Sequence, residues 1–118
     1  MKSEQQNPRG KINSILRIVA RHGGVTVDDI LGNDRSDRAV AARQVSQVLI
    51  AKHLGISSPV AISRIFGVHH TTVINSFDRI ELEMQADGPR SHLYRKADAA
   101  IAAHIIGKVG GELQGAGA

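Results

Sequence analysis

The residues with the clearest chemical potential lie together in the stretch His69–Asn75, which reads HHTTVIN. Their ring nitrogens, hydroxyls and amide can donate or accept hydrogen bonds, which is what reading the edges of base pairs requires. Thr71 and Asn75 are four residues apart, so they share one face of a helix. A threonine methyl can also contact thymine. The stretch therefore has the chemistry of a surface that reads base edges.

Catalysis and metal binding fit the same residues poorly. The chain has no cysteine, so thiolate ligands and cysteine nucleophiles are excluded. His69 and His70 are adjacent, so on a helix their side chains point about 100° apart, and no carboxylate lies at ligand spacing from both. No GxSxG motif, paired-carboxylate motif or GxxxxGK[ST] phosphate loop is present. We therefore expect no catalytic residue, no metal, no cofactor and no small-molecule substrate, and a protein that is not an enzyme.

The other histidines are expected to have structural positions only. We place His22, His53 and His92 at the surface. His104 falls on the apolar face of the last predicted helix, where an interior or boundary position is expected.

Two predicted helices position the stretch His69–Asn75. The second begins at His69 or His70. The first follows Ser57-Ser58-Pro59, because serine caps a helix and proline suits its first turn, and it lasts about two turns. Phe66-Gly67-Val68 is a tight connection between them, and two helices joined by a short glycine-containing turn are typical of the helix-turn-helix. The apolar face of the second helix, spaced by 4, 3 and 4 residues, consists of Val73, Phe77, Ile80 and Met84.

The rest of the chain also predicts helices. Thr26 suits the cap of a short helix that ends at Gly32. The polar, glycine-led sequence of Gly32–Arg38 predicts a loop. No segment alternates apolar and polar residues with period two, so the predicted fold class is all-α, a compact bundle of about six helices with a helix-turn-helix and no sheet. The further predicted helices are Lys11–His22, the short helix from Val25-Thr26 to Gly32, Ala39–Leu54 and Arg90–Ile106.

Charge is distributed unevenly along the chain. The formal net charge is +4 and the sequence pI is about 10.0. A local basic cluster in a small protein indicates a polyanionic partner, although charge alone is equally compatible with a solvated surface of mixed sign. The basic residues of this cluster, between positions 35 and 64, are Arg35, Arg38, Arg43, Lys52 and Arg64.

Nothing in the sequence indicates a membrane. The segment Met1–Gly10 is polar and lacks an apolar signal region. The longest apolar runs are far shorter than a membrane span. We expect a cytoplasmic, nucleoid-associated protein with no membrane partner.

Four segments together carry a resemblance to a known family. They are Val25–Gly32 (VTVDDILG), Ala42-Arg43-Gln44, Ile62–Val73 (ISRIFGVHHTTV) and Arg79-Ile80-Glu81, in that order. Over about residues 11–84 the chain resembles the C-terminal DNA-binding domain, domain IV, of the bacterial replication initiator DnaA. An ordered set of motifs is much harder to obtain by chance than a single one. The resemblance implies a shared fold and double-stranded DNA as the partner.

The resemblance also implies roles for individual residues. Arg35 is placed like the loop arginine that enters the minor groove. Ser36, Arg43 and Gln44 match positions that hold the phosphate backbone, and Lys52 matches a lysine near the end of the long helix. Ser58 and Pro59 match the start of the helix that approaches the backbone and thymine methyls, and His70, Thr71 and Thr72 match the start of the recognition helix. The expected DNA-binding residues are Arg35, Ser36, Arg38, Arg43, Gln44, Lys52, Ser58, Pro59, His69, His70, Thr71, Thr72 and Asn75.

The chain departs from the family pattern at several positions. The turn Gly67-Val68-His69 is one residue shorter than usual, with Val68 at a basic position and His69 at the position of an aspartate. Aspartate accepts a hydrogen bond from the cytosine amino group, whereas neutral histidine can donate or accept one. The other departures are Asp34 and Asp37 in a loop that is usually basic, and Ala42 where proline is common. DNA binding is expected to be retained, and the family's usual target sequence is in question.

By length the chain is one domain with attached segments. We expect a flexible N-terminal arm (1–10), the DnaA domain IV-like helix-turn-helix domain (11–86), an additional C-terminal helix (87–106) and a disordered tail (107–118). The initiator's ATPase module is expected to be missing, because its phosphate loop is not in the sequence.

Three functions fit these features. The first is a bacterial or phage regulator of replication or transcription that occupies a specific DNA site. The second is an interaction protein that competes with the host initiator or tethers partners to it, with Arg90–Ile106 as the docking helix. The third is a nonspecific nucleic-acid binder, which uses only the basic cluster.

Overall fold

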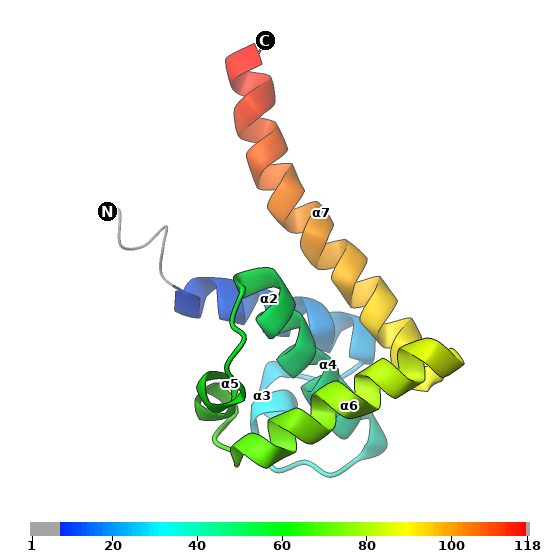
Figure 1. Cartoon of the computed structure of the whole chain (residues 1–118). Coiled ribbons are helices and arrows are strands. Elements are labelled where there is room, and N and C mark those ends of the chain that lie inside the picture. Colours follow the sequence, from blue (N-terminus) through cyan, green and yellow to red (C-terminus); the bar gives the residue numbers. More distant parts are fainter. Residues whose placement is uncertain (1–7, 118) are drawn as a thin grey trace.

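The described part of the chain is built from helices alone. The computed structural model describes the backbone of residues 8–117 and the side chains of residues 9–105. No strand occurs within these residues, which confirms the all-α prediction (Figure 1). The helices are α2 (Pro8–Gly23), α3 (Val27–Leu31), α4 (Asp37–Leu54), α5 (Pro59–Phe66), α6 (His70–Ala86) and α7 (Pro89–Gly117).

Polar side chains cap the starts of α3, α4 and α5, and the sequence predicted the caps of α3 and α5. Thr26 and Asp29 form a reciprocal capping box at the start of α3, with both hydrogen bonds at 3.0 Å. The Ser36 hydroxyl accepts from the amide of Ala39 at α4, and the Ser58 hydroxyl accepts from Ala61 at α5. These caps satisfy amides that have no partner within their helix, and each contributes about 1 kcal/mol to stability.

The central element is α4, which contacts every other described helix. Its buried residues include Val45, Leu49 and Ile50, which join Leu16 of α2 and Ile62 of α5 in one aliphatic core. The predicted face of α6 is also confirmed: Val73 and Ile80 are buried, and Phe77 and Met84 are partly buried against the core. Because apolar burial contributes about 25 cal/mol per Å², this core is the main stabilising feature of the fold.

Two polar side chains of α4 also lie inside. Ser46 and Gln47 are fully buried, and neither side chain has a hydrogen-bond partner among the described residues. A buried polar group without a partner costs about 1–3 kcal/mol. The sequence pattern did not predict Gln47 in the core.

The largest differences from the expected helix boundaries are in the first and the last helix. The first helix begins at Pro8 rather than at Lys11, because proline is favoured in a first turn. The last helix was expected to end at Ile106, but α7 continues to Gly117, through the segment expected to be disordered. Glycine lowers helix propensity by about 1 kcal/mol per residue without ending a helix, and no proline follows Pro89.

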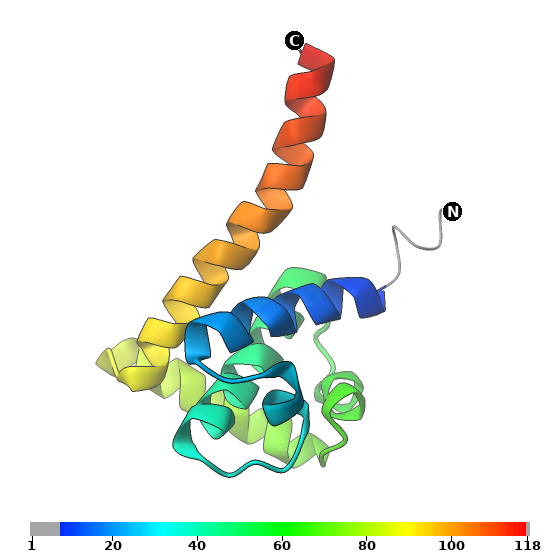
Figure 2. The same cartoon turned by 180° about the vertical axis from the view of Figure 1, so that it is seen from behind.

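The molecule has two distinct ends. In both Figures 1 and 2, the loop before α4 and the start of α6 lie at the lower end, and α7 leaves the body towards the opposite end. Among the described residues, no helix has the length and apolar character needed to cross a membrane.

Candidate nucleic-acid interface

The turn between α5 and α6 fixes the direction of the second helix. Gly67 has a φ of 65°, in the left-handed region, and its amide bonds to the carbonyl of Ser63. The amide of Val68 donates to the same carbonyl at 3.1 Å. No atom lies within 4 Å of a Cβ placed on Gly67, so glycine is favoured here by the backbone angle rather than by space. Since Phe66 before the turn and Val73 after it are both buried, the two helices form a rigid unit.

The first turns of α6 present polar groups to solvent. We call the side chains of His69, His70, Thr71, Thr72 and Asn75 the α6 surface; all are exposed. His69 is the cap of the helix, and its Nδ1 accepts from the backbone amide of Thr71 at 3.2 Å. The Nδ1 atom also lies 2.8 Å from Oγ1 of Thr71, and the rings of His69 and His70 are 4.4 Å apart. The structure therefore brings the predicted base-reading residues together on one free surface.

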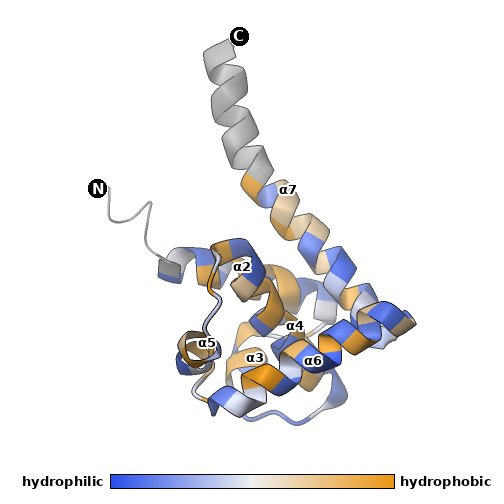
Figure 3. Cartoon of the chain, viewed as in Figure 1, coloured by the Kyte–Doolittle hydropathy of each residue, from blue (hydrophilic) through white to orange (hydrophobic). Residues whose placement is uncertain are grey.

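The loop before α4 contains the predicted minor-groove arginine. Arg35 is exposed, and the loop is coloured hydrophilic along with the start of α6 (Figure 3). Asp34 accepts from the amide of Ser36 at 2.8 Å, and this backbone hydrogen bond is the main reason that the pKa of the Asp34 carboxyl is lowered. The Ser36 hydroxyl is used as the α4 cap, so of the pair Arg35 and Ser36 only the arginine side chain is uncommitted.

Arg43 supports this loop instead of facing solvent. Its Nε donates to the carbonyl of Ile30 at 2.7 Å, and one terminal nitrogen donates to the carbonyls of Asp29 and Asp34 at 2.9 Å. The side chain is half-buried. These bonds join the end of α3 to the loop, so three of the guanidinium donors that a phosphate would need are already used.

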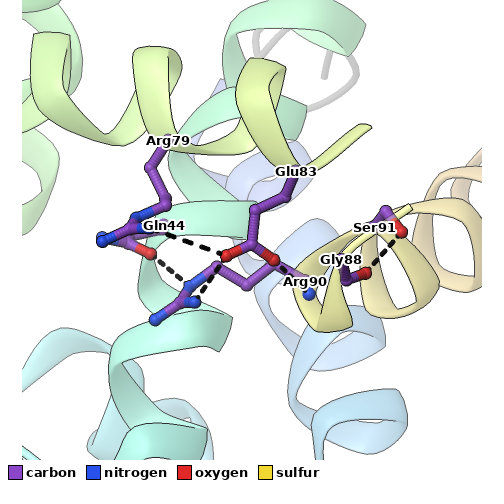
Figure 4. A network of polar contacts seen from close by, with 6 residues as sticks. All are labelled: Gln44, Arg79, Glu83, Gly88, Arg90 and Ser91. Atoms are coloured by element: carbon purple, nitrogen blue, oxygen red, sulfur yellow. Dashed lines mark hydrogen bonds and ion pairs between the residues drawn. The ribbon is translucent and has the colours of Figure 1, made fainter. Parts of the chain in front are cut away.

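Gln44 belongs to a polar network with α6 and α7 (Figure 4). Its Oε1 accepts from Nε of Arg90 at 2.6 Å, and the Arg90 guanidinium donates to Glu83 at 2.8 Å. Glu83 also accepts from the backbone amide of Arg90 at 2.7 Å. A Cβ on Gly88 would lie 2.8 Å from a carboxylate oxygen of Glu83 and 3.3 Å from its Cβ, so a larger residue here would displace the Glu83 side chain.

Lys52 is held by α7 in a second group. Its Nζ lies 2.8 Å from Asp98, whose other oxygen lies 2.7 Å from Nε2 of His53. Partial burial raises the pKa of Asp98, but the hydrogen bonds from Lys52 and His53 outweigh it and the pKa is lowered. The same contact raises the pKa of Lys52. We call these two groups the α7 network; its members are Gln44, Lys52, His53, Glu83, Arg90 and Asp98.

The predicted environments of two histidines are wrong. The His53 side chain is only 12% exposed, because it packs beside Asp98 rather than at the surface. His104 is exposed, because it lies beyond Ile101, the last buried residue in the described part of α7.

The remaining expected residues lie at helix starts. Ser58 caps α5 and Pro59 occupies its first turn. Arg38 is exposed, and a Cβ on Gly24 would lie 3.7 Å from its guanidinium. With Pro89 and Leu93 it lines a shallow pocket, so it lies beside the start of α7.

A family model described as the bacterial DnaA protein helix-turn-helix matches residues 12–80, more than half of the chain. The chain belongs to this family. The match includes the loop before α4, all of α5 and the α6 surface.

Individual DnaA proteins agree with this assignment. The chain is 38% identical over 74 residues to the chromosomal replication initiator protein DnaA of Nostoc punctiforme, covering 63% of this chain and 16% of that protein. It is 41% identical over 76 residues to DnaA 2 of Chlamydia pneumoniae, covering 64% and 17%. A crystal structure of a DNA replication initiation factor has a TM-score of 0.67 at 30% identity, covering 85% of this chain and 32% of that one. The chain thus spans only a minor part of the DnaA proteins it matches.

The match to the DnaA helix-turn-helix ends within α6, before three of the charged residues of the α7 network. Glu83, Arg90 and Asp98 follow residue 80, and the sequence did not single them out as partners of Gln44 and Lys52. In the sequence, only the opposite charges of these residues indicated that they could pair. Each contact joins residues 46 positions apart, which charge patterning along a DnaA-like sequence cannot pair.

Proposed function

We propose that this chain binds double-stranded DNA at a specific sequence, on the nucleoid in the cytoplasm, and regulates replication or transcription by occupying that site. The observation that carries the proposal is the α6 surface. Its donors and acceptors are exposed on a rigid second helix, in the part of the chain that belongs to the DnaA helix-turn-helix family. A helix of this kind fits the major groove, where base pairs present distinct patterns of donors and acceptors.

The neighbouring elements support the same docking. When α6 lies in the major groove, the loop with Arg35, at the same end of the molecule in both views, is available for the adjacent minor groove. An exposed arginine suits that position because the minor groove has a negative potential. The helix starts capped by Ser36, Ser58 and His69 carry the positive ends of helix dipoles, which favour phosphates.

The alternative of a docking helix in α7 has less support. Ile101 and Ala97 are buried, and Leu93 is partly buried against the core. These apolar side chains are thus engaged within the chain, and Ile105 is the exposed large hydrophobic side chain of the described part of α7. This arrangement favours a structural role for the helix over an interface with the replication initiator.

A selection from random duplexes tests the proposal. The full chain is expected to enrich one consensus sequence and to bind it much more tightly than random DNA, whose binding falls steeply with salt. The matched control is the Thr71→Ala/Asn75→Ala variant. Both residues are exposed, so its helical signal should be unchanged while the enrichment is lost. Equal affinity for the selected and random duplexes would instead indicate a nonspecific binder.

A further inference from the structure

The two ring nitrogens of His69, at the start of α6, differ in their contacts. One is hydrogen-bonded within the protein, and the other is not. Its Nδ1 lies 3.2 Å from the backbone nitrogen of Thr71. A backbone N–H can only donate, so Nδ1 must be the acceptor. A neutral imidazole that accepts at Nδ1 carries its proton on Nε2. The helix cap therefore selects the tautomer of His69.

The same contact orients the hydroxyl of Thr71. Its Oγ1 lies 2.8 Å from Nδ1 of His69. Because Nδ1 bears no proton in this tautomer, the hydroxyl hydrogen must point at the ring. The lone pairs of Oγ1 are then left for an external donor. One capping interaction thus sets a donor, the Nε2–H of His69, beside an acceptor, the hydroxyl oxygen of Thr71, on an exposed surface.

We infer that His69 is a specificity-determining residue that donates a hydrogen bond from Nε2 to a base acceptor in the major groove and thereby disfavours cytosine, the base that has no acceptor there. This inference rests on the proposed DNA binding. Guanine O6 and N7, thymine O4 and adenine N7 accept, whereas cytosine presents only its amino donor. An aspartate at this position can only accept and selects cytosine, so this chain has the opposite preference at the base that position 69 faces.

Replacing His69 by asparagine or by aspartate distinguishes its capping role from its role as an outward hydrogen-bond donor. Both are good cap residues with a side-chain oxygen that can accept from the Thr71 amide. His69→Asn keeps an outward N–H donor next to that oxygen, whereas the nearly isosteric His69→Asp replaces it with a second acceptor. Any difference between the two variants therefore reports the outward group and not the cap.

The decisive experiment is a binding-site selection run in parallel on the parent chain, His69→Asn and His69→Asp. The parent and His69→Asn are expected to exclude cytosine at the same position, and His69→Asp to select cytosine there. Placing cytosine at that position should weaken binding about tenfold for the parent and strengthen it for His69→Asp. One shared consensus from all three proteins would overturn the inference and leave the proposed function intact. Loss of a consensus from the parent itself would overturn both.

A measurement without DNA tests the tautomer directly. In ¹⁵N-labelled protein at a pH where the ring is neutral, Nε2 of His69 is expected to show the shift of a protonated ring nitrogen and Nδ1 that of an unprotonated one. His70, which does not cap the helix, is the internal comparison. The reverse assignment for His69 would overturn the inference, because Nδ1 could not then accept from Thr71.

Discussion

Two regions of the molecule contain residues that the DnaA resemblance assigns to DNA, and they differ in how free those residues are. On the α6 surface and at Arg35 the side chains are exposed and face solvent. In the α7 network, Gln44 and Lys52 are held by Arg90 and Asp98. A resemblance therefore indicates where a residue lies but not whether its side chain is free to contact DNA. Whether a side chain can reach a phosphate depends on contacts from elements outside the matched motif.

The largest expected effect comes from replacing Arg43. It is on the free energy of unfolding and not on the salt dependence of DNA binding. Arg43→Ala removes hydrogen bonds to three carbonyls, so the free energy of unfolding in urea should fall by about 2–3 kcal/mol. Arg43→Lys should recover less than half of this loss, because an ammonium lacks the planar fork. The salt dependence of DNA binding should be unchanged at temperatures where the variants are folded. A slope shallower by about one unit with unchanged stability would instead identify Arg43 as a phosphate contact.

The second prediction concerns Arg35, which lies in the region whose side chains are exposed. Arg35→Ala should weaken binding to the selected duplex by about 1–3 kcal/mol without changing the helical signal, since the side chain is exposed. The control is Arg17→Ala, which removes an exposed arginine from α2. Fluorescence titration of labelled duplex measures both. Equal losses from the two variants would show that Arg35 acts only through net charge.

Asp98 tests whether the α7 network limits the use of Lys52. Asp98→Asn should free Lys52 and tighten DNA binding by about three- to tenfold at low salt, with a salt slope steeper by up to about one unit. Asp87→Asn removes another carboxylate, one that pairs with Arg95 instead, and should change affinity less. If Asp98→Asn weakens binding, the ion pair positions Lys52 and does not compete for it.

The smallest expected effect is on the free energy of unfolding at acidic pH. Hydrogen bonds from Lys52 and His53 hold the pKa of Asp98 below the ordinary value of an aspartate, so the folded state binds this proton less readily than the unfolded state. The stabilisation by Asp98 is then present above about pH 4 and is lost as the pH falls through the lowered pKa. Asp98→Asn should therefore be less stable than the parent near pH 6 by up to about 1 kcal/mol, and the gap should close towards pH 2. A constant gap in urea unfolding across this range would contradict the assignment.

Much of the fold could be predicted because its signals are local. Thr26, Ser58 and Gly67 mark helix ends through their own backbone preferences, and the spacing of Val73 to Met84 identified the buried face of α6. The residues of the α6 surface were predictable for the same reason, since they follow one turn on one helix.

The positions of the other expected contacts could not be predicted. The bonds of Arg43 depend on where three carbonyls of a loop come to lie, and no residue type in the sequence encodes that. The partners of Gln44 and Lys52 depend on how α7 crosses α4, which is a property of packing. Helix propensity also left the end of α7 undetermined, because glycines weaken a helix without stopping it.

The connection between α6 and α7 has a geometric consequence for DNA-bound molecules. It consists of Asp87, with a φ of 56°, and Gly88, and the hydrogen bonds from Arg90 to Glu83 join the two helices across it. If α6 lies in the major groove, the direction in which α7 leaves the duplex follows from the position of the binding site. Copies on sites separated by whole helical turns of about 10.5 base pairs would then display α7 on the same side of the DNA, and copies half a turn out of phase would display it on opposite sides.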